Sequence, residues 1–124
     1  MADQGIESLV GRLLIHVEVV GDNQELLFRC MDGAVYRMHH RQDCCESCNL
    51  VEIVGDLRDL HGLVVEAYEA SSEGVPPPAD SYEPESYTWT FYVLCTNKGT
   101  VTFRWYGTSN GYYSERAHFE RVDN

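Results

Sequence analysis

The sequence predicts a single, mainly β domain over residues 1–124, with an antiparallel β-sheet or sandwich-like fold and one short helix. Apolar and polar residues alternate with a period of two in several segments, which is the pattern of half-buried strands. Tight-turn residues such as Asp32-Gly33 separate these segments. The length fits one domain with a sizeable core, and no internal repeat is visible. We expect roughly six or seven strands.

The first part of the chain predicts a three-stranded meander. Residues 12–20 alternate in polarity, and so do residues 24–30 and 34–40. The Asp32-Gly33 turn joins the second and third strands as a hairpin. In the first strand, the period of two places four aliphatic side chains on one face. These are Leu13, Ile15, Val17 and Val19.

The middle of the chain predicts a break, a helical turn and a further strand. Residues 41–49 are polar and interrupt the periodicity. Residues 55–62 predict one or two helical turns, with Asp56 as the N-cap and Gly62 as the stop. Residues 63–70 alternate again and predict a strand.

An exposed loop separates the middle of the chain from three closing strands. Residues 71–86 are rich in Pro, Ser and Glu, and no central strand tolerates their three consecutive prolines. The closing strands are predicted at residues 87–96, 100–107 and 112–122, joined by two hairpins. Residues 87–96 carry bulky side chains on both faces, which predicts a central strand.

The charge balance narrows the class of partner. The formal net charge is -11 at pH 7. A negative field repels phosphate backbones and anionic lipids, so we expect no direct nucleic-acid binding and no membrane binding. A protein partner with a basic surface fits better, although the acidity also keeps a small protein soluble. The chain has no bilayer-length apolar run and starts without a secretory signal, which predicts a cytoplasmic protein with reduced cysteines.

Histidine and cysteine residues between positions 39 and 48 offer two site hypotheses. The ligands of a zinc site would be His40, Cys44, Cys45 and Cys48. Only half of the usual paired spacing is present, so we predict no metal and no other cofactor. The centre of a small hydrolase would be His40, Asp43, Cys44 and Glu46. Acidic surroundings oppose thiol catalysis because they raise the pKa of a thiol, and a tight turn with buried thiols explains the same residues.

The segment WYGTSNGYYSE, residues 105–115, is the densest aromatic stretch. Its glycines and asparagine supply the positive φ angles of a hairpin loop, but the turn does not account for the rings. Trp105 belongs to the buried face, whereas Tyr106 and its neighbours cannot all point inward, so we expect a contact surface. The predicted binding residues are Arg104, Tyr106, Ser109, Asn110, Tyr112 and Tyr113, together with Asp43 and Glu46. An aromatic corner that pins the hairpin is the structural alternative.

Three segments together resemble a small uncharacterised domain family that recurs in phage and prophage genomes. They are HRQDCCES, GDLRDLHG and TWTFYVLCT with the following VTFRWYGTSNGYYSE. The resemblance covers roughly residues 8–122 and implies no established catalytic residues. In the family pattern the position of Cys48 is more often aliphatic, which counts further against a metal half-site. For a phage-encoded chain, the resemblance implies a location in the host-cell cytoplasm.

We therefore order three functional hypotheses. The first is a phage-type accessory binding protein without catalysis, specifically a counter-defence factor that inhibits a host defence protein through its acidic surface. The second is a small-ligand or nucleotide binder that stacks its ligand on the tyrosine-rich hairpin beside Arg104. The third is the hydrolase or metal site. A concave pocket that joins residues 41–46 to the hairpin would favour a ligand or catalysis, and a flat acidic surface would favour a protein partner.

Overall fold

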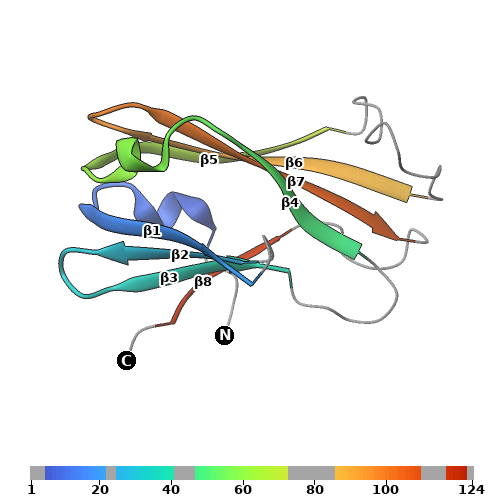
Figure 1. Ribbon diagram of the computed structural model, residues 1–124, viewed down its shortest axis with the longest axis horizontal. Coiled ribbons are helices and arrows are strands. Elements are labelled where there is room, and N and C mark those ends of the chain that lie inside the picture. Colours follow the sequence, from blue (N-terminus) through green and yellow to red (C-terminus); the bar gives the residue numbers. More distant parts are fainter. Residues whose placement is uncertain (1–4, 22–24, 41–46, 73–85, 110–116, 123–124) are drawn as a thin grey trace.

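A computed structural model shows a sandwich of two antiparallel four-stranded sheets (Figure 1). The structure describes residues 5–21, 25–40, 47–72, 86–109 and 117–122. The first sheet has the order β1-β2-β3-β8 and the second the order β4-β7-β6-β5. The strands are β1 (Leu14–Val20), β2 (Glu25–Cys30), β3 (Val35–His39), β4 (Ser47–Val54), β5 (Val64–Ser72), β6 (Ser86–Thr96), β7 (Thr100–Ser109) and β8 (His118–Arg121). The mainly β prediction is confirmed, with eight strands in the described residues rather than six or seven.

The order of the elements repeats along the chain. A 3-10 turn, η1 (Ile6–Leu9), precedes β1 to β4, and a second one, η2 (Leu57–Leu60), precedes β5 to β8. Each half contributes three consecutive strands to one sheet and its fourth strand to the other, since β8 pairs with β3 and β4 pairs with β7. This repeat lies in the order of the strands and not in residue identity, which is why no repeat is visible in the sequence. The exchanged strands prevent the halves from separating without loss of strand pairing.

Backbone hydrogen bonds join the two sheets where β1 and β5 begin, a junction that we call the seam. Leu13 and Leu63 form an isolated antiparallel bridge, flanked by two hydrogen bonds of 2.9 Å each. The carbonyl of Leu13 also accepts a hydrogen bond of 2.8 Å from Met31 N in the β2–β3 turn. The carbonyl of Leu63 accepts one of 3.1 Å from Asn97 N in the β6–β7 turn. The seam therefore fixes both hairpins as well as both edge strands.

The edge strands of both sheets have features that hinder pairing with another chain. The ladders break at Ile15 in β1, at Val51 in β4 and at Val65 in β5, each an extra residue in an edge strand. The fourth edge strand, β8, is only four residues long. Bulges and short strands both hinder edge-to-edge association.

The first strand differs from the prediction in which side chains face the core, because of the bulge at Ile15. Val17 is buried and Val19 packs against the core, as predicted. Leu13 and Ile15 are exposed instead, and Leu14 fills the core position. One extra residue in a strand moves the side chains on one side of it to the opposite face, so a strict period of two fails across the bulge.

Aromatic rings form the centre of the core between the sheets. Phe28 of β2 meets Phe103 of β7 edge to face, with ring centroids 5.8 Å apart, and it lies 5.7 Å from Phe119 of β8. Tyr92 of β6 adds a buried hydrogen bond of 3.1 Å from its hydroxyl to the carbonyl of Ala117, just before β8. These contacts connect the two sheets and also the two halves of the chain.

The predicted helix within residues 55–62 is a single 3-10 turn, η2. Asp56 is its N-cap, as predicted, and accepts a hydrogen bond of 2.9 Å from Arg58 N. Hydrogen bonds from the side chain and the backbone of Arg58 lower the pKa of Asp56 from 3.8 to about 2. Leu60 is fully buried beneath the turn. None of the helices in the described part of the chain has the length and apolar character needed to cross a membrane.

The later elements follow the prediction with shifted ends. β6 lies between β5 and β7, so the predicted central strand is confirmed. β5 continues to Ser72 and β6 begins at Ser86, whereas the rest of the predicted loop, residues 73–85, lies outside the described residues. β8 begins at His118, and the earlier part of the predicted last strand, residues 112–116, lies outside the described residues.

Replacement of Thr90 by Val is expected to stabilise the protein by about 1 kcal/mol, because it removes a buried unpaired hydroxyl. Thr90 is fully buried, and its Oγ1 has no hydrogen-bond partner among the described residues. Thr96→Val is the matched control and should destabilise by about 1–3 kcal/mol. Its Oγ1 donates to the carbonyl of Asp59 and accepts from Lys98 N. Urea denaturation measures both, and a loss of stability in Thr90→Val would contradict the prediction.

Asp56→Asn is expected to make the stability of the protein depend less on pH in the acid range. Asp56 titrates at about 2 in the folded chain against an ordinary value of 3.8. Its carboxylate therefore contributes stability that is present above the ordinary value and lost as the pH falls through the folded value. Asn can still cap the turn but carries no charge. Denaturation midpoints across this acid range should fall more steeply in the wild type, and parallel curves would contradict the assignment.

Candidate functional site

The predicted binding residues divide between β7 and segments outside the described residues. Arg104 and Tyr106 lie two positions apart on the outer face of β7, and Ser109 is the last residue of that strand. The remaining predicted residues lie outside the described part of the chain: Asn110, Tyr112, Tyr113, Asp43 and Glu46. Of the predicted set, the structure therefore brings Arg104 and Tyr106 together on one surface.

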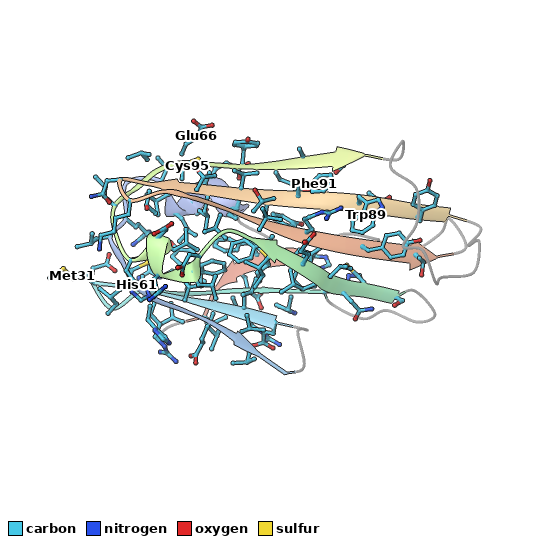
Figure 2. The ribbon with its side chains drawn as sticks, turned by 45° about the horizontal axis from the view of Figure 1, so that its top comes forward. Met31, His61, Glu66, Trp89, Phe91 and Cys95 are labelled. Carbon is cyan, nitrogen blue, oxygen red and sulfur yellow. The ribbon has the colours of Figure 1, made fainter. Side chains whose placement is uncertain are left out.

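Arg104 lies over two aromatic rings of the neighbouring strand, β6. Its guanidinium carbon is 4.9 Å from the ring centroid of Trp89 and 5.7 Å from that of Phe91, which is cation–π range. The two rings are within 6° of parallel and share the outer face of β6 (Figure 2). Arg104 also forms an ion pair with Glu52 of β4. Three adjacent strands thus hold one guanidinium group in place.

Tyr106 extends this cluster along β7. Its ring centroid is 4.9 Å from that of Trp89 and 5.9 Å from that of Tyr87. The cluster lies on a regular part of the sheet, where the β6–β7 ladder runs without a shift in register. We call this set the aromatic face. It consists of Glu52, Tyr87, Trp89, Phe91, Arg104 and Tyr106.

Sequence reasoning identified Arg104 and Tyr106 but did not place Trp89 and Phe91 beside them. A signal was present in the β6–β7 hairpin, because a short turn fixes which residues face each other. That register sets Phe91 opposite Arg104 and Trp89 opposite Tyr106. Glu52 had no comparable local signal, since it lies 52 residues before Arg104 and depends on the pairing of β4 with β7.

The residues of the aromatic face differ in their exposure. The side chain of Glu52 is 51% exposed and that of Arg104 is 31% exposed, whereas Trp89 is 4% exposed. Depressions lined by described residues include one between η1 and the β2–β3 turn and one at the β4 bulge. Glu52 of the aromatic face lines the one at the β4 bulge. Small ligands favour concave sites that enclose them, and the rings of Trp89 and Phe91 line neither of these two.

A second cluster lies on the outer face of the first sheet, where β3 pairs with β8. His39 Nε2 and Glu120 Oε1 are 3.0 Å apart, and the two residues are only 8% and 9% exposed. His118 lies opposite His39, and its ring centroid is 5.6 Å from that of His40. A carboxylate in this position fixes the orientation of an imidazole ring. Sequence reasoning missed Glu120, which lies 81 residues from its partner.

The structure describes two members of the predicted metal and hydrolase sites. His40 directly follows β3, and Cys48 points from β4 into the core. The other members lie outside the described residues: Asp43, Cys44, Cys45 and Glu46. Within the described ranges, no group of three or more His, Cys, Asp or Glu side chains is placed to hold a metal ion.

Comparison with family models gives one match that covers most of the chain. The chain belongs to the family described as "Domain of unknown function (DUF7448)", whose model matches residues 7–119. No curated protein and no solved structure gives a match. The expectation of an uncharacterised domain family is thus confirmed, and the family description carries no activity.

A double-mutant cycle is expected to show that His39 and Glu120 are energetically coupled. His39→Ala and Glu120→Ala should each destabilise by about 1–3 kcal/mol, because each removes a buried hydrogen bond between β3 and β8. The double variant should lose less than the sum, with a coupling of about 1 kcal/mol or more. The exposed pair His16 and Glu18, 3.8 Å apart, is the matched control and should show almost no coupling. Additive losses at His39 and Glu120 in urea denaturation would contradict a direct link between β3 and β8.

Proposed function

We propose that this family member is a protein-binding module that acts without catalysis, with the aromatic face as its contact surface. The observation that carries the proposal is the position of Arg104 over Trp89 and Phe91. Tryptophan, tyrosine and arginine are the residues that most often dominate the binding energy of protein interfaces. Here they gather on the outer face of a sheet, where Arg104 and Glu52 are the more exposed members and the buried ring of Trp89 lies beneath Arg104.

The rigidity of the aromatic face supports the same function. Arg104 is held by the two rings of β6 and by Glu52 of β4. A side chain that is already ordered loses little conformational entropy on binding, so more of its contact energy contributes to affinity. Its neighbours project from regular strands rather than from loops, which keeps their geometry fixed.

The charge of the second sheet indicates a basic partner. Its strands carry Glu52, Glu66 and Glu69 against a single cation, Arg104. The ion pair between Arg104 and Glu52 leaves the sheet with net negative charge. Complementary charge on a partner accelerates association and suppresses wrong partners. The overall charge of -11 has the same sign.

The resemblance to small phage-borne domains supports a finer version of the proposal. In that context the partner is a host defence protein with a basic channel, and the acidic chain inhibits it by offering carboxylates in place of phosphates. This version places the protein in the host-cell cytoplasm. It also makes the partner a protein that binds nucleic acid by itself, so the two ligands should compete.

The alternative of a small nucleotide ligand is favoured by one observation, the nearly parallel rings of Trp89 and Phe91 beside Arg104. Two features weigh against it. Trp89 is 4% exposed, which limits stacking on its ring. Arg104 is already paired with Glu52, so a phosphate would have to displace a carboxylate.

The proposal is tested by capture from host-cell extract with the wild type and with Phe91→Ala and Arg104→Ala. We expect one protein to be enriched by the wild type, and we expect each variant to weaken the purified complex by about tenfold or more, as for interface hot spots. Arg104→Lys should weaken it as well, because an ammonium group cannot reproduce the planar contact with the rings. Arg29→Ala, at an exposed pair with Glu18 on the other sheet, is the matched control and should bind normally.

The salt dependence of the association rate separates the contribution of charge from that of the aromatic contact. Association with a basic partner should slow as salt rises, since exposed charges are screened beyond roughly 8 Å at physiological ionic strength. A salt-independent rate would remove the acidic steering and leave the aromatic contact. Unchanged affinity in Phe91→Ala and Arg104→Ala, with melting temperatures close to the wild type, would contradict the proposed surface. Native mass spectrometry that shows a bound nucleotide would support the alternative.

A further inference from the structure

We propose that the seam carries a second docking surface, independent of the aromatic face, which takes an apolar side chain from a basic protein segment. Six aliphatic or methionine side chains form this surface, and each is between 41% and 69% exposed. We call them the seam patch: Val10, Leu13, Ile15, Met31, Leu63 and Val65. Single exposed apolar residues are normal, but contiguous groups of them mark interaction sites.

The backbone of the seam explains why these residues lie together. Leu13 and Leu63 face each other in the antiparallel bridge, which is flanked by hydrogen bonds rather than closed by them. Side chains of such non-hydrogen-bonded pairs lie especially close. Two residues further along each strand, Ile15 and Val65 occupy the bulges and are exposed. Met31 is tied to the same place by its hydrogen bond to Leu13.

The patch includes a depression that can receive a side chain. An open hollow of about 580 Å³ lies between η1, the start of β1 and the β2–β3 turn. Val10, Leu13 and Met31 supply its apolar wall. The ion pair between Arg12 and Asp32, 2.8 Å long, lines the same hollow. An apolar wall beside a charged group fits a segment in which an apolar residue is followed by a basic one. The flexible thioether of Met31 adapts to side chains of different shape.

The charge of the chain indicates which kind of partner binds the seam patch. The segments that form it carry Glu7, Asp32 and Glu66 as well as Arg12 and Lys98, and Asp32 and Arg12 form an ion pair with each other. Glu7 and Glu66 form no ion pair with other described residues. A second copy of the chain would bring another net charge of -11 to the contact, and an anionic bilayer would repel the patch. A basic protein segment is attracted instead.

The seam patch is separate from the aromatic face. Met31 and His61 lie at one end of the sandwich, and Trp89 lies toward the other end (Figure 2). The two surfaces also use different strands, with β1 and the start of β5 at the seam and β4, β6 and β7 at the aromatic face. Variants of one surface therefore leave the contacts of the other in place.

Selection from a random library of twelve-residue displayed peptides tests the inference with the full-length chain as bait. We expect enriched peptides to combine a large apolar residue with neighbouring Lys or Arg. Met31→Asp should weaken the binding of such a synthetic peptide at least tenfold, and Glu66→Gln should weaken it less. Val54 of β4 is 49% exposed, which lies within the range of the patch residues. Val54→Asp is therefore the matched control, and it should bind the peptide normally. Phe91→Ala should also bind normally, which separates this result from that of the proposed function.

Amide chemical shifts of the wild type provide a second readout that does not depend on variant folding. The peptide should move the amides of Val10, Leu13, Met31 and Leu63. Peptides that bind equally well to Met31→Asp, or no enrichment over a bead-only selection, would overturn the inference. Sedimentation experiments that show self-association of the wild type, and its loss in Met31→Asp, would assign the patch to a second copy. That result would also overturn the inference. Binding to phosphatidylserine vesicles through the patch would assign it to a lipid surface and overturn it equally.

Discussion

The antiparallel bridge between Leu13 and Leu63 is the contact on which the rest of the structure depends. It pairs the residues that directly precede β1 and β5, two strands of different sheets, so it holds the sheets together at one edge. The same two carbonyls accept hydrogen bonds from the β2–β3 and β6–β7 turns.

The exchange of β4 and β8 between the sheets also holds the two layers together. β4 and β8 each cross to the sheet built by the other half, and the ring contacts of Phe28 with Phe103 and Phe119 join the layers between them. Such pairings have high sequence separation, so they carry a larger loop-closure entropy than the local hairpins. The fold protects its edges by bulges and by a short β8. The exposed surfaces are thus left to side chains rather than to backbone pairing.

The two proposed surfaces differ in the physical origin of their specificity. The aromatic face presents an ordered guanidinium group on two rings, and its affinity would come from planar contact and preorganisation. The seam patch presents adaptable aliphatic groups beside a hollow, and its specificity would come from a side chain of fitting size with a basic neighbour. Acidic charge is common to both and favours one class of partner, a basic protein, over nucleic acid or anionic lipid.

The sequence by itself determined the features that depend on near neighbours in the chain. These are the opening meander, the cap at Asp56, the central position of β6 and the outward position of Arg104 and Tyr106. Periodicity and turn chemistry act over a few residues, so they can be read from a single segment. Only the tertiary structure decided the strand exchange, the partners Glu52 and Glu120, and the bulge that exposes Leu13 and Ile15. The physical reason is that strand pairing and register depend on contacts between residues far apart in the chain, which no local pattern specifies.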